Sequence, residues 1–430
     1  MLSGFSDKVN QRWEEPVTKT KPYSISKHAV WEAFCRVKAN RGTAGVDGQS
    51  IEDFEVDLKD NLYKVWNRMS SGSYFPPPVR TLDIPKSDGR SRRLGIPAVS
   101  DRVAQMVVKM YLEPQVAPIF HADSYGYITG KSALDAVAVV RKRCWRYGWV
   151  LDLDIQGFFD EIDHNLMLHA VRKHTNSRWI LLYIERWLKA PAQLADGSLI
   201  EREKGTPQGG VISPLLANIF LHHVFDEWMR VSHPIAVFAR YADDIIVHCR
   251  TEFQAKFMLR AIELRLARCK LKLSPQKTKI VYCKNATRPG SYMHESFDFL
   301  GYEFRARLCK GRNCFVGFTP AVSKSAVKEM GAKIRGWKLQ LWSSASLEDI
   351  AKRINPVVRG WLNYYGKFRK TALYPILRQI QNALVRWAMR KYKRLRGHWR
   401  RAAHWLGRIA RREPRLLASW GFGFRPSAGH

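Results

Sequence analysis

Residues Arg240-Tyr241-Ala242-Asp243-Asp244 separate two apolar runs, 235–238 and 245–247, that are rich in β-branched side chains. Apolar runs on either side of a short polar segment predict a β-hairpin, here with acidic residues at its tip. Upstream, residues 149–155 alternate apolar and acidic positions, which predicts a strand with Asp154 on its acidic face. An acidic face on a strongly basic chain favours a bound cation.

Taken alone, these acids have an ordinary explanation. Asp-Asp is a common turn dipeptide, and Asp154 could lie on the solvated face of an edge strand. The chemical alternative is nucleotidyl transfer, which needs carboxylates that bridge two Mg²⁺ ions ~4 Å apart. One ion activates the attacking hydroxyl and the other holds the triphosphate. A strand and a neighbouring hairpin can supply such ligands.

The charge balance indicates the class of partner. The 430 residues include 72 Lys and Arg against 38 Asp and Glu, a net charge of +34, and 46% of the chain is hydrophobic. This length predicts two or three domains with ample core material. A polycation of this size binds phosphate polymers, so nucleic acid is the expected partner. A membrane-surface protein would concentrate its charge in one amphipathic helix, whereas here it is spread along the chain.

The cysteines and the apolar segments indicate where the protein works. The seven cysteines are scattered and form no Cys-x-x-Cys pair, which fits a reducing cytoplasm rather than a zinc site or a disulfide framework. No apolar run approaches the ~20 residues of a membrane span, and the N-terminus is polar. We therefore expect a cytoplasmic, nucleoid-associated protein of bacterial type without a membrane partner.

Periodicity and turn residues place the other elements. Ser26 is positioned to cap a first helix, and strands are expected at 79–84 and 92–96 around the turn Ser87-Asp88-Gly89. A helix is expected from Ser213 to Trp228. After about residue 320 the sequence turns to helical patterns that are rich in Trp, Arg and Lys, a mixture that suits base stacking and phosphate contact.

The order of the motifs resembles the reverse transcriptases encoded by group II introns, over roughly residues 25 to 400. The matching blocks, from fingers to primer-gripping hairpin, are 84–86, 92–97, 101–105, 154–160, 205–210 with 213–218, 241–244, 273–278 and 299–302. The segment Gly360-Trp361-Leu362-Asn363-Tyr364-Tyr365 is similar to the signature of the maturase, or X, domain.

This resemblance implies a right-hand polymerase of the α/β (α+β) class, with fingers and palm built on an antiparallel sheet, followed by a helical thumb. The implied domains are an N-terminal extension, fingers and palm, a thumb or maturase X domain, and a basic nucleic-acid-binding tail, at residues 1–50, 51–315, 316–390 and 391–430.

The resemblance also assigns roles to residues. Asp154, Asp243 and Asp244, the catalytic acids, would hold two Mg²⁺ ions together with Ile155. Four residues would bind the nucleotide: Lys86, Arg92, Phe159 and Gln208. Six would contact nucleic acid: Tyr241, Gly301, Tyr302, Trp361, Tyr364 and Tyr365. Phe159 could equally be a core side chain, and Lys86 and Arg92 could belong to a solvated basic face. Arg90 and Arg93 lie beside them, so the choice of Arg92 among these arginines stays open.

The chain departs from the family pattern in three places. Residues 128–132 read Ile-Thr-Gly-Lys-Ser where the family has an Arg-Pro-Gly-Arg-Ser type of segment, so altered template contacts are expected there. Gln156 replaces a common lysine. The C-terminal region lacks the cysteine pairs and the His-Asn-His constellation of an endonuclease, and Cys309 with Cys314 are too few for zinc. Second-strand cleavage is therefore not expected.

The implied reaction is the RNA-templated addition of dNTPs to a primer 3′ end. The implied partners are an RNA template with a DNA primer, a group II intron RNA whose splicing is assisted, and target DNA. Two alternatives stay open. A splicing maturase with a vestigial polymerase would not need its three acids intact, whereas a domesticated reverse transcriptase of repair or defence would share every residue. The sequence carries no signal for an oligomeric state.

Overall fold

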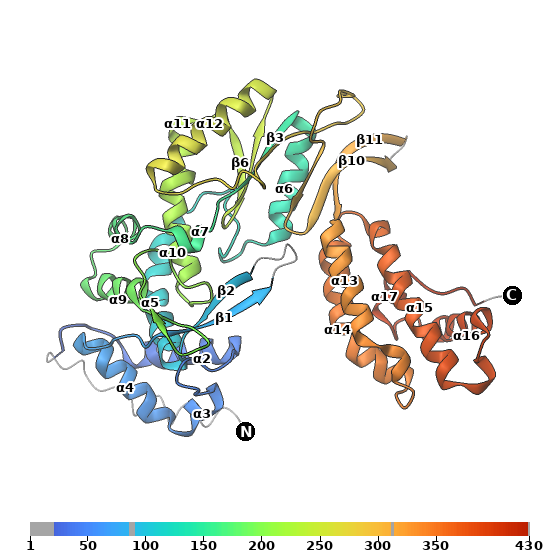
Figure 1. Ribbon diagram of the computed structural model, residues 1–430, viewed down its shortest axis with the longest axis horizontal. Coiled ribbons are helices and arrows are strands. Elements are labelled where there is room, and N and C mark those ends of the chain that lie inside the picture. Colours follow the sequence, from blue (N-terminus) through green and yellow to red (C-terminus); the bar gives the residue numbers. More distant parts are fainter. Residues whose placement is uncertain (1–20, 86–90, 311–313, 429–430) are drawn as a thin grey trace. The chain divides into compact units, whose positions relative to one another are not determined.

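The computed structural model describes residues 21–85, 91–310 and 314–428 (Figure 1). These residues form two compact units, each built from segments that are distant in the sequence. Unit 1 consists of Met1–Ser132, Leu153–Val247 and Lys256–Thr278, and unit 2 of Ala133–Asp152, His248–Ala255 and Lys279–His430. The expected succession of a mixed α/β region with antiparallel sheets and a helical region is confirmed.

Unit 1 begins with helices around a small aromatic core. Helix α2 starts where the sequence predicted, because the Ser26 side chain accepts hydrogen bonds from the amides of His28 and Ala29. The rings of Phe34 and Phe54 stack with centroids 5.7 Å apart and join it to the next helix. The helices of this part are α2 (Lys27–Asn40), α3 (Ile51–Val56), α4 (Leu58–Ser71) and α5 (Val99–Val116).

The predicted strands at 79–84 and 92–96 are confirmed as an antiparallel pair in a four-stranded sheet of order β2-β1-β4-β5. The pairing of β1 with β4 is parallel. The predicted turn at 87–89 lies outside the described residues. The strands are β1 (Val79–Pro85), β2 (Ser91–Ile96), β4 (Ala192–Gln193) and β5 (Leu199–Ile200).

The helix predicted from Ser213 to Trp228 forms in three parts: α10, a π-helical turn η2, and α11. A π-turn inserts an extra residue and rotates the side chains that follow it, which here concerns Asp226. The remaining helices that belong wholly or mainly to unit 1 are η1 (Ala117–Ile119), α7 (Phe158–Glu161), α8 (His164–Arg172), α9 (Arg178–Lys189), α10 (Ser213–Leu221), η2 (His222–Asp226), α11 (Glu227–Ser232) and α12 (Glu252–Arg268).

A second four-stranded sheet has the order β6-β7-β3-β8. It contains the strand predicted at 149–155, as β3, and the predicted acidic hairpin, as β6 and β7. Strands β3 and β8 are antiparallel, with Trp149 opposite Tyr282. The strands are β3 (Trp149–Asp154), β6 (Val237–Tyr241), β7 (Asp244–Cys249) and β8 (Lys279–Tyr282).

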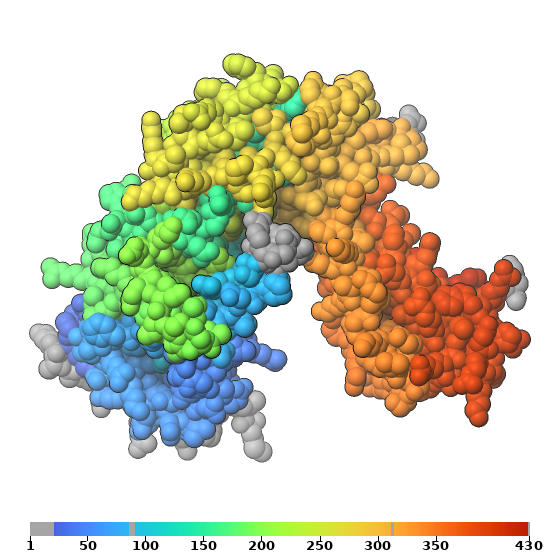
Figure 2. Space-filling view, in the orientation of Figure 1, coloured from blue at the N-terminus to red at the C-terminus, as the bar shows by residue number. Residues whose placement is uncertain are grey.

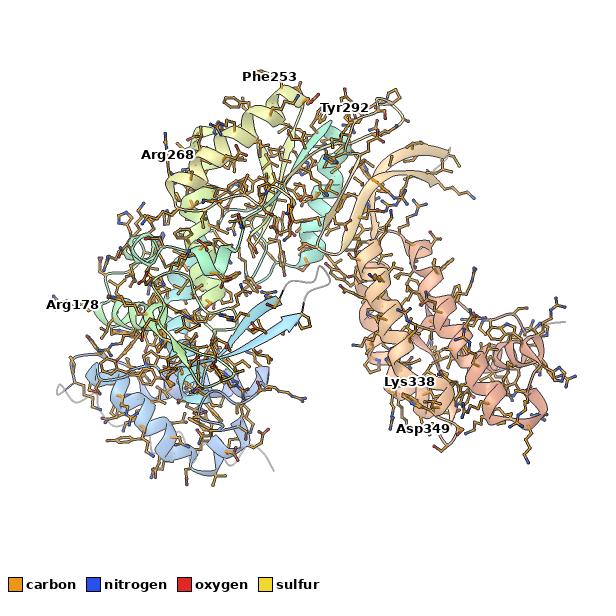
Figure 3. The ribbon with its side chains drawn as sticks, in the orientation of Figure 1. Arg178, Phe253, Arg268, Tyr292, Lys338 and Asp349 are labelled. Atoms are coloured by element: carbon orange, nitrogen blue, oxygen red, sulfur yellow. The ribbon has the colours of Figure 1, made fainter. Side chains whose placement is uncertain are left out.

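Unit 2 contains a three-stranded antiparallel sheet of order β11-β10-β9 with α6 (Ala133–Arg146) packed on β11. Trp145 Nε1 donates a hydrogen bond to Phe318 O at 2.9 Å and fixes this contact. Nearby, Tyr292 meets the ring of Trp149 edge-on at 4.6 Å (Figure 3). The strands are β9 (Ser296–Phe299), β10 (Tyr302–Lys310) and β11 (Cys314–Val322).

The C-terminal half of unit 2 is helical, as its composition predicted (Figure 1, orange to red). Figure 2 shows the atoms of the same residues in the same colours. Lys338, with φ of +48°, ends α13, and a capping box of Ser346 and Asp349 starts α14 (Figure 3). None of the helices in the described residues is long and apolar enough to cross a membrane. The helices are α13 (Lys324–Trp337), η3 (Leu339–Leu341), α14 (Leu347–Tyr365), η4 (Lys370–Leu373), α15 (Tyr374–Lys391), η5 (Lys393–Leu395), α16 (Trp399–Arg412) and α17 (Ala418–Gly421).

One hydrophobic core unites these helices, and it includes residues of the predicted basic tail. Leu406 on α16 and Trp420 on α17 are buried in the same cluster as Ile350 and Trp387. Trp387 is completely buried and donates a hydrogen bond from Nε1 to Trp342 O at 2.9 Å, so this ring is a core residue and not a surface for base stacking. The cations of α16 are carried on a folded scaffold.

Candidate active site

Asp154 is the last residue of β3, and backbone hydrogen bonds hold the chain on both sides of it. The Ser274 amide donates to the Asp154 carbonyl at 2.8 Å, and the Gln156 amide donates to the Lys272 carbonyl at 2.9 Å. The Asp154 carboxylate forms an ion pair with Lys277, whose Nζ lies 3.0 Å from Oδ1. The segment that follows α12 therefore holds Asp154 and supplies it with a positive charge. The sequence did not single out Lys277 for this role.

Asp243 lies in the two-residue turn between β6 and β7. The first residue of this turn, Ala242, has φ of +56°, a left-handed conformation that costs an L-residue roughly 1–2 kcal/mol. Burial raises the pKa of the Asp243 carboxyl above its ordinary value, and the negative charge of Asp154 raises it further. The two carboxylates therefore lie close enough to repel each other.

This pair of carboxylates fits a divalent cation. Mg²⁺ prefers hard oxygen ligands, which both aspartates provide. Asp154 and Asp243 place two negative charges in a poorly solvated part of the protein, and both burial and this repulsion raise the pKa of Asp243. A bound cation would relieve the repulsion. Lys277 forms its ion pair with Asp154, and its charge together with that of Arg92 offsets part of the rise in the pKa of Asp243.

The other two predicted metal ligands lie next to this pair in the sequence. Asp244 is the first residue of β7, and Ile155 forms an isolated antiparallel bridge directly after β3. Within the described part of the chain, no group of three or more His, Cys, Asp or Glu side chains is gathered closely enough to hold a metal ion. The structure thus brings Asp154 and Asp243 together, and the metal-binding role of all four residues stays a prediction.

A row of polar contacts connects β2 with α7 through the loop before α10. Arg92 Nε donates to Gln208 Oε1 at 2.6 Å, and Gln208 Nε2 donates to Asp160 Oδ2 at 3.5 Å. Arg93 instead faces Asp83 across the hairpin, with Nε 3.3 Å from Oδ1. Successive side chains of a strand point to opposite faces, so only Arg92 of the two arginines lies with Gln208.

The glycine-rich loop 205–210 passes close to neighbouring backbone. A Cβ on Gly209, whose φ is +120°, would lie 2.5 Å from Gly95 O, and a Cβ on Gly205, whose φ is +83°, would lie 2.8 Å from a carbonyl oxygen of α7. The close backbone approach that Gly209 permits is therefore to β2. These glycines pack the loop that carries Gln208.

Two further nucleotide-site predictions concern Phe159 and Lys86. Phe159 is 8% exposed, its ring meets that of Phe158 edge-on at 5.3 Å, and its carbonyl accepts a hydrogen bond from the Thr206 amide at 2.7 Å. The burial of Phe159 fits a core side chain. Its contact with the glycine-rich loop 205–210 fits a residue of the nucleotide site, so both interpretations stay open. Lys86 lies outside the described residues.

The predicted primer-gripping hairpin is a tight turn in unit 2. Leu300 and Gly301 have φ of +51° and +76°, as in the two-residue type I′ turns that favour glycine. Tyr302 is completely buried; its ring lies 5.4 Å from those of both Tyr364 and Tyr365, and its hydroxyl donates to the carbonyl of Tyr364. The side chain of Tyr302 therefore offers no surface to nucleic acid, and a contact at this position would use the backbone.

Two other aromatic residues predicted to contact nucleic acid keep part of their surface exposed. Tyr241, beside the Ala242-Asp243 turn of unit 1, lies with its ring centroid 6.4 Å from that of Tyr127. Trp361 in unit 2 stacks on Trp337 at 5.9 Å. Both rings can take a further stacking partner, and their role stays a prediction.

In the segment 128–132, which departs from the family pattern, Lys131 makes contacts within unit 1. Lys131 donates hydrogen bonds from Nζ to the carbonyl oxygens of His121, Ala122 and Ser124 at 3.1, 2.7 and 2.8 Å. An ammonium group that satisfies three carbonyls braces the loop before α6 and has little capacity left for a template phosphate. This contact gives a structural role to the lysine of 128–132.

A buried polar cluster beneath the Asp243 turn was not predicted. Arg240 and Asp226 form an ion pair without any side-chain exposure, with 2.6 Å between Nη2 and Oδ2. Its signal in the sequence is the arginine inside the apolar strand 237–241, because a buried charge needs a partner. The sequence could not identify Asp226 as that partner, since the π-turn of η2 orients it.

Comparison with known proteins identifies two families along the chain. Residues 84–304, about half of the chain, match the family described as reverse transcriptase (RNA-dependent DNA polymerase). Residues 327–405 match the family described as group II intron, maturase-specific domain. The first match includes both carboxylates of the candidate site, and the second includes Trp361, Tyr364 and Tyr365.

Individual relatives agree with these matches. Protein YkfC of Escherichia coli K12 is 30% identical over 298 residues, which are 60% of this chain and 75% of that protein. The group II intron-encoded protein LtrA of Lactococcus lactis subsp. cremoris is 29% identical over 227 residues, 52% and 37% of the two chains. An uncharacterized 91 kDa protein in the cob intron of Schizosaccharomyces pombe is 23% identical over 411 residues, 80% and 50%. The chain thus spans half or less of the two intron proteins.

Proposed function

This chain belongs to the reverse transcriptase family and carries the maturase-specific domain of group II intron proteins, and on that basis we propose that it is an active RNA-directed DNA polymerase. It adds dNTPs to the 3′ end of a primer on an RNA template. The observation that carries the proposal is the pair Asp154 and Asp243, whose carboxylates come from the end of β3 and from the β6–β7 turn and repel each other in a poorly solvated place.

The proposed cofactor is Mg²⁺, as two ions, held by Asp154 and Asp243 with Asp244 and Ile155. Bound Mg²⁺ activates the primer hydroxyl and neutralises the charge of the triphosphate. In this structure Lys277 Nζ donates hydrogen bonds to both Asp154 oxygens, at 3.0 and 3.1 Å, and holds that carboxylate in place at the end of β3. The carboxylate is then ready for a cation of higher charge.

The nucleotide side of the site is assigned to Arg92 and Gln208. The guanidinium of Arg92 is exposed and fixed by its hydrogen bond to Gln208 Oε1 at 2.6 Å, so it is pre-oriented for the oxygens of a triphosphate. Gln208 in turn is held by the backbone, because its carbonyl accepts a hydrogen bond from the Gly95 amide at 2.7 Å. Strand β2 therefore positions both side chains.

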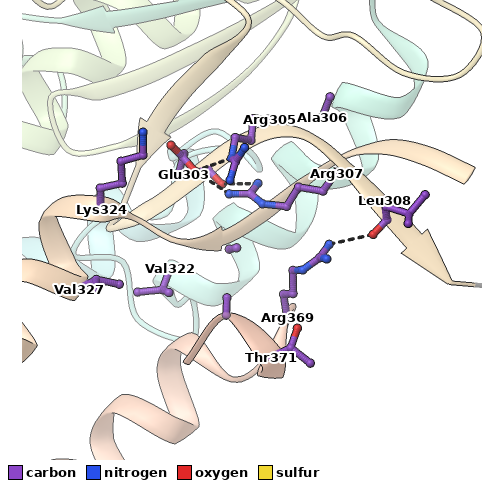
Figure 4. Close-up of a pocket in the computed structure, with 12 residues that line it drawn as sticks. Glu303, Arg305, Ala306, Arg307, Leu308, Val322, Lys324, Val327, Arg369 and Thr371 are labelled. Atoms are coloured by element: carbon purple, nitrogen blue, oxygen red, sulfur yellow. Dashed lines mark hydrogen bonds and ion pairs between the residues drawn. The ribbon is translucent and has the colours of Figure 1, made fainter. Parts of the chain in front are cut away.

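We propose a second function, the binding of intron RNA to assist splicing, from the basic surface of unit 2. A groove of about 680 Å³ in unit 2 has a lining that includes Arg305, Arg307, Lys324 and Arg369, but a single acid, Glu303. Figure 4 shows these side chains. Glu303 forms ion pairs with Arg305 and Arg307 at 2.8 and 2.7 Å. One carboxylate cannot neutralise four cations, so the groove keeps an excess of positive charge for backbone phosphates.

The alternatives differ in what they require of the acids. A vestigial maturase would use the basic surface alone, and it gains nothing from a hairpin that holds Asp243 in a strained turn beside Asp154. A domesticated reverse transcriptase for repair or defence would use the same site as an intron protein. Target DNA, template and primer are thus proposed partners that follow from the polymerase reaction.

Primer extension tests the proposal. Purified protein with Mg²⁺ and dNTPs is expected to extend a DNA primer annealed to RNA, and Asp243→Ala is expected to abolish extension while RNA binding is retained, because the substitution removes a metal ligand and leaves the basic surfaces intact. Asp196→Ala is the matched control, since Asp196 is an acid of the same unit that only accepts hydrogen bonds within its own turn.

Two results would count against the polymerase. Full extension by Asp243→Ala would remove Asp243 from the catalytic site. A wild-type protein that binds intron RNA and promotes splicing but never extends a primer would support the vestigial maturase.

A further inference from the structure

Four buried polar side chains lie beneath the turn that carries Asp243. Arg240, Asp226 and Ser124 are 0% exposed and Asn218 is 1% exposed. They come from the loop before α6, from α10, from the π-turn η2 and from β6. Buried polar groups persist only where partners compensate them, so the geometry of their bonds shows what they hold in place.

The charges of this cluster are compensated internally. Arg240 donates to Asp226 through two nitrogens, Nε to Oδ1 at 2.8 Å and Nη2 to Oδ2 at 2.6 Å. Ser124 Oγ donates to Asp226 Oδ2 at 2.8 Å. This two-bond pairing fixes the plane of the guanidinium and so fixes the direction of its remaining nitrogen, Nη1.

That third nitrogen contacts the catalytic turn. Arg240 Nη1 donates to the Ala242 carbonyl at 3.1 Å and to Asn218 Oδ1 at 3.0 Å. Asn218 Nδ2 donates to the Gly126 carbonyl at 2.7 Å. Gly126 also packs against the turn, where a Cβ would be only 2.4 Å from the Ala242 amide nitrogen. The Ala242 carbonyl is thus bound by Arg240, and the Ala242 amide is packed against Gly126.

The turn needs such support because of its own conformation. Ala242 adopts φ of +56°, which L-residues avoid unless their surroundings impose it. A relaxed turn would rotate the following residue, Asp243, and change the distance between its carboxylate and that of Asp154.

We infer that Arg240 is a positioning residue: together with Asp226 and Asn218 it holds the Ala242 turn in its left-handed conformation and thereby keeps the Asp243 carboxylate beside Asp154 before a metal binds. The inference rests on the proposed polymerase function and deepens it, because it names the structure that sets the metal affinity of the site. The alternative is that the cluster only stabilises unit 1.

Arg240→Lys separates the two roles. Lysine keeps the positive charge opposite Asp226 but lacks the planar fork that reaches Asp226, Asn218 and the Ala242 carbonyl together. In the metal-free protein without nucleic acid, hydrogen–deuterium exchange of peptides covering 238–246 is expected to become about ten-fold faster, while peptides elsewhere in unit 1 keep their protection. Primer extension is expected to lose about 100-fold in kcat and to need several-fold more Mg²⁺, with an unchanged KM for primer-template.

Two further variants make the test independent of folding defects. Asn218→Ala removes the link between Arg240 and Gly126 without disturbing the ion pair, and it is expected to show the same local exchange and Mg²⁺ effects in weaker form. Tyr183→Phe removes a buried hydrogen bond to Met69 O in the same unit, and it is expected to lower stability without changing the Mg²⁺ requirement or the protection of 238–246.

The outcomes are distinguishable from a failure of the polymerase proposal. Normal protection of 238–246 and a normal Mg²⁺ requirement in both Arg240→Lys and Asn218→Ala would overturn the inference and leave a purely stabilising cluster. If the wild-type protein does not extend primers, the polymerase proposal fails. The exchange measurement then still decides whether Arg240 orders the turn.

Discussion

Burial controls the chemistry of Asp243 more than any single neighbour does. Loss of hydration is the largest cause of the raised pKa of its carboxyl, followed among the effects that raise it by the charge of Asp154. The carboxylate form is therefore disfavoured in the folded protein until a cation compensates it. The positive charges of Arg92 and Lys277 act in the opposite direction and lower the pKa of Asp243, but they do not outweigh its burial.

This difference predicts a pH-dependent stability that Mg²⁺ modifies. The folded protein holds the Asp243 proton more tightly than the unfolded chain, so the contribution of this group is present at low pH and is lost as pH rises from about 4 through the raised pKa. Thermal unfolding without metal should therefore show wild type losing stability relative to Asp243→Asn over that range. Added Mg²⁺ should restore part of the loss in wild type alone. A Tm difference that is independent of both pH and Mg²⁺ would contradict this account.

The β1–β2 hairpin shows how an element assigns different roles to adjacent residues. In its register Arg92 lies opposite Ile84 and Arg93 opposite Asp83. The alternation of a strand directs Arg92 to Gln208 and Arg93 to the ion pair with Asp83, in which both side chains are 53% exposed. The sequence left the choice between these arginines open.

The hairpin therefore predicts unequal effects of two similar substitutions. Arg92→Ala is expected to raise the KM for dNTPs by roughly 10-fold or more, as for the loss of a charge-assisted contact to phosphate. Arg93→Ala is the matched control and should leave KM unchanged, because an exposed ion pair contributes about 0–1 kcal/mol to stability and nothing to the site. Steady-state extension at varied dNTP concentration measures both. Equal increases in KM would refute the assignment by strand face.

At the scale of the whole chain, the excess of cations is carried on folded surfaces. Helix α16 of unit 2 contributes to the net charge of +34. Its inner side is buried in the helical core, while Arg400, Arg408 and Arg411 are exposed. These three arginines recur at helical spacing and form a stripe along one side of the helix. A rigid stripe of cations loses less entropy on binding phosphates than a flexible tail does.

This charge distribution predicts a steep salt dependence of RNA binding. The logarithm of the association constant should fall linearly with the logarithm of salt concentration, because bound phosphates release counterions. Replacing Arg400, Arg408 and Arg411 together by Gln should reduce that slope by about 2 to 3. Arg260→Gln on α12 is the control, since Arg260 already faces Glu263. A flat slope in the wild-type protein would refute phosphate binding as the source of affinity.

Local patterns predicted the elements well. The capped helix after Ser26, the strands around 79–84 and 92–96, strand 149–155 and the acidic hairpin all formed as expected. Each depends on interactions within a few residues, such as a side-chain cap or apolar alternation, which the sequence states directly. The chain order of the motifs also sufficed to identify the family, which the matches at 84–304 and 327–405 confirm.

The sequence thus determined which elements form and in what order, and it proposed the acids of the candidate site. Only the tertiary structure decided how these residues are paired: Arg92 with Gln208, Lys277 with Asp154, and Arg240 with Asp226. It also placed Tyr302 inside the protein, although the sequence predicted a nucleic-acid contact there. The physical reason is that pairing and burial arise between segments far apart in the chain, where packing and desolvation select one partner among many that the local sequence allows.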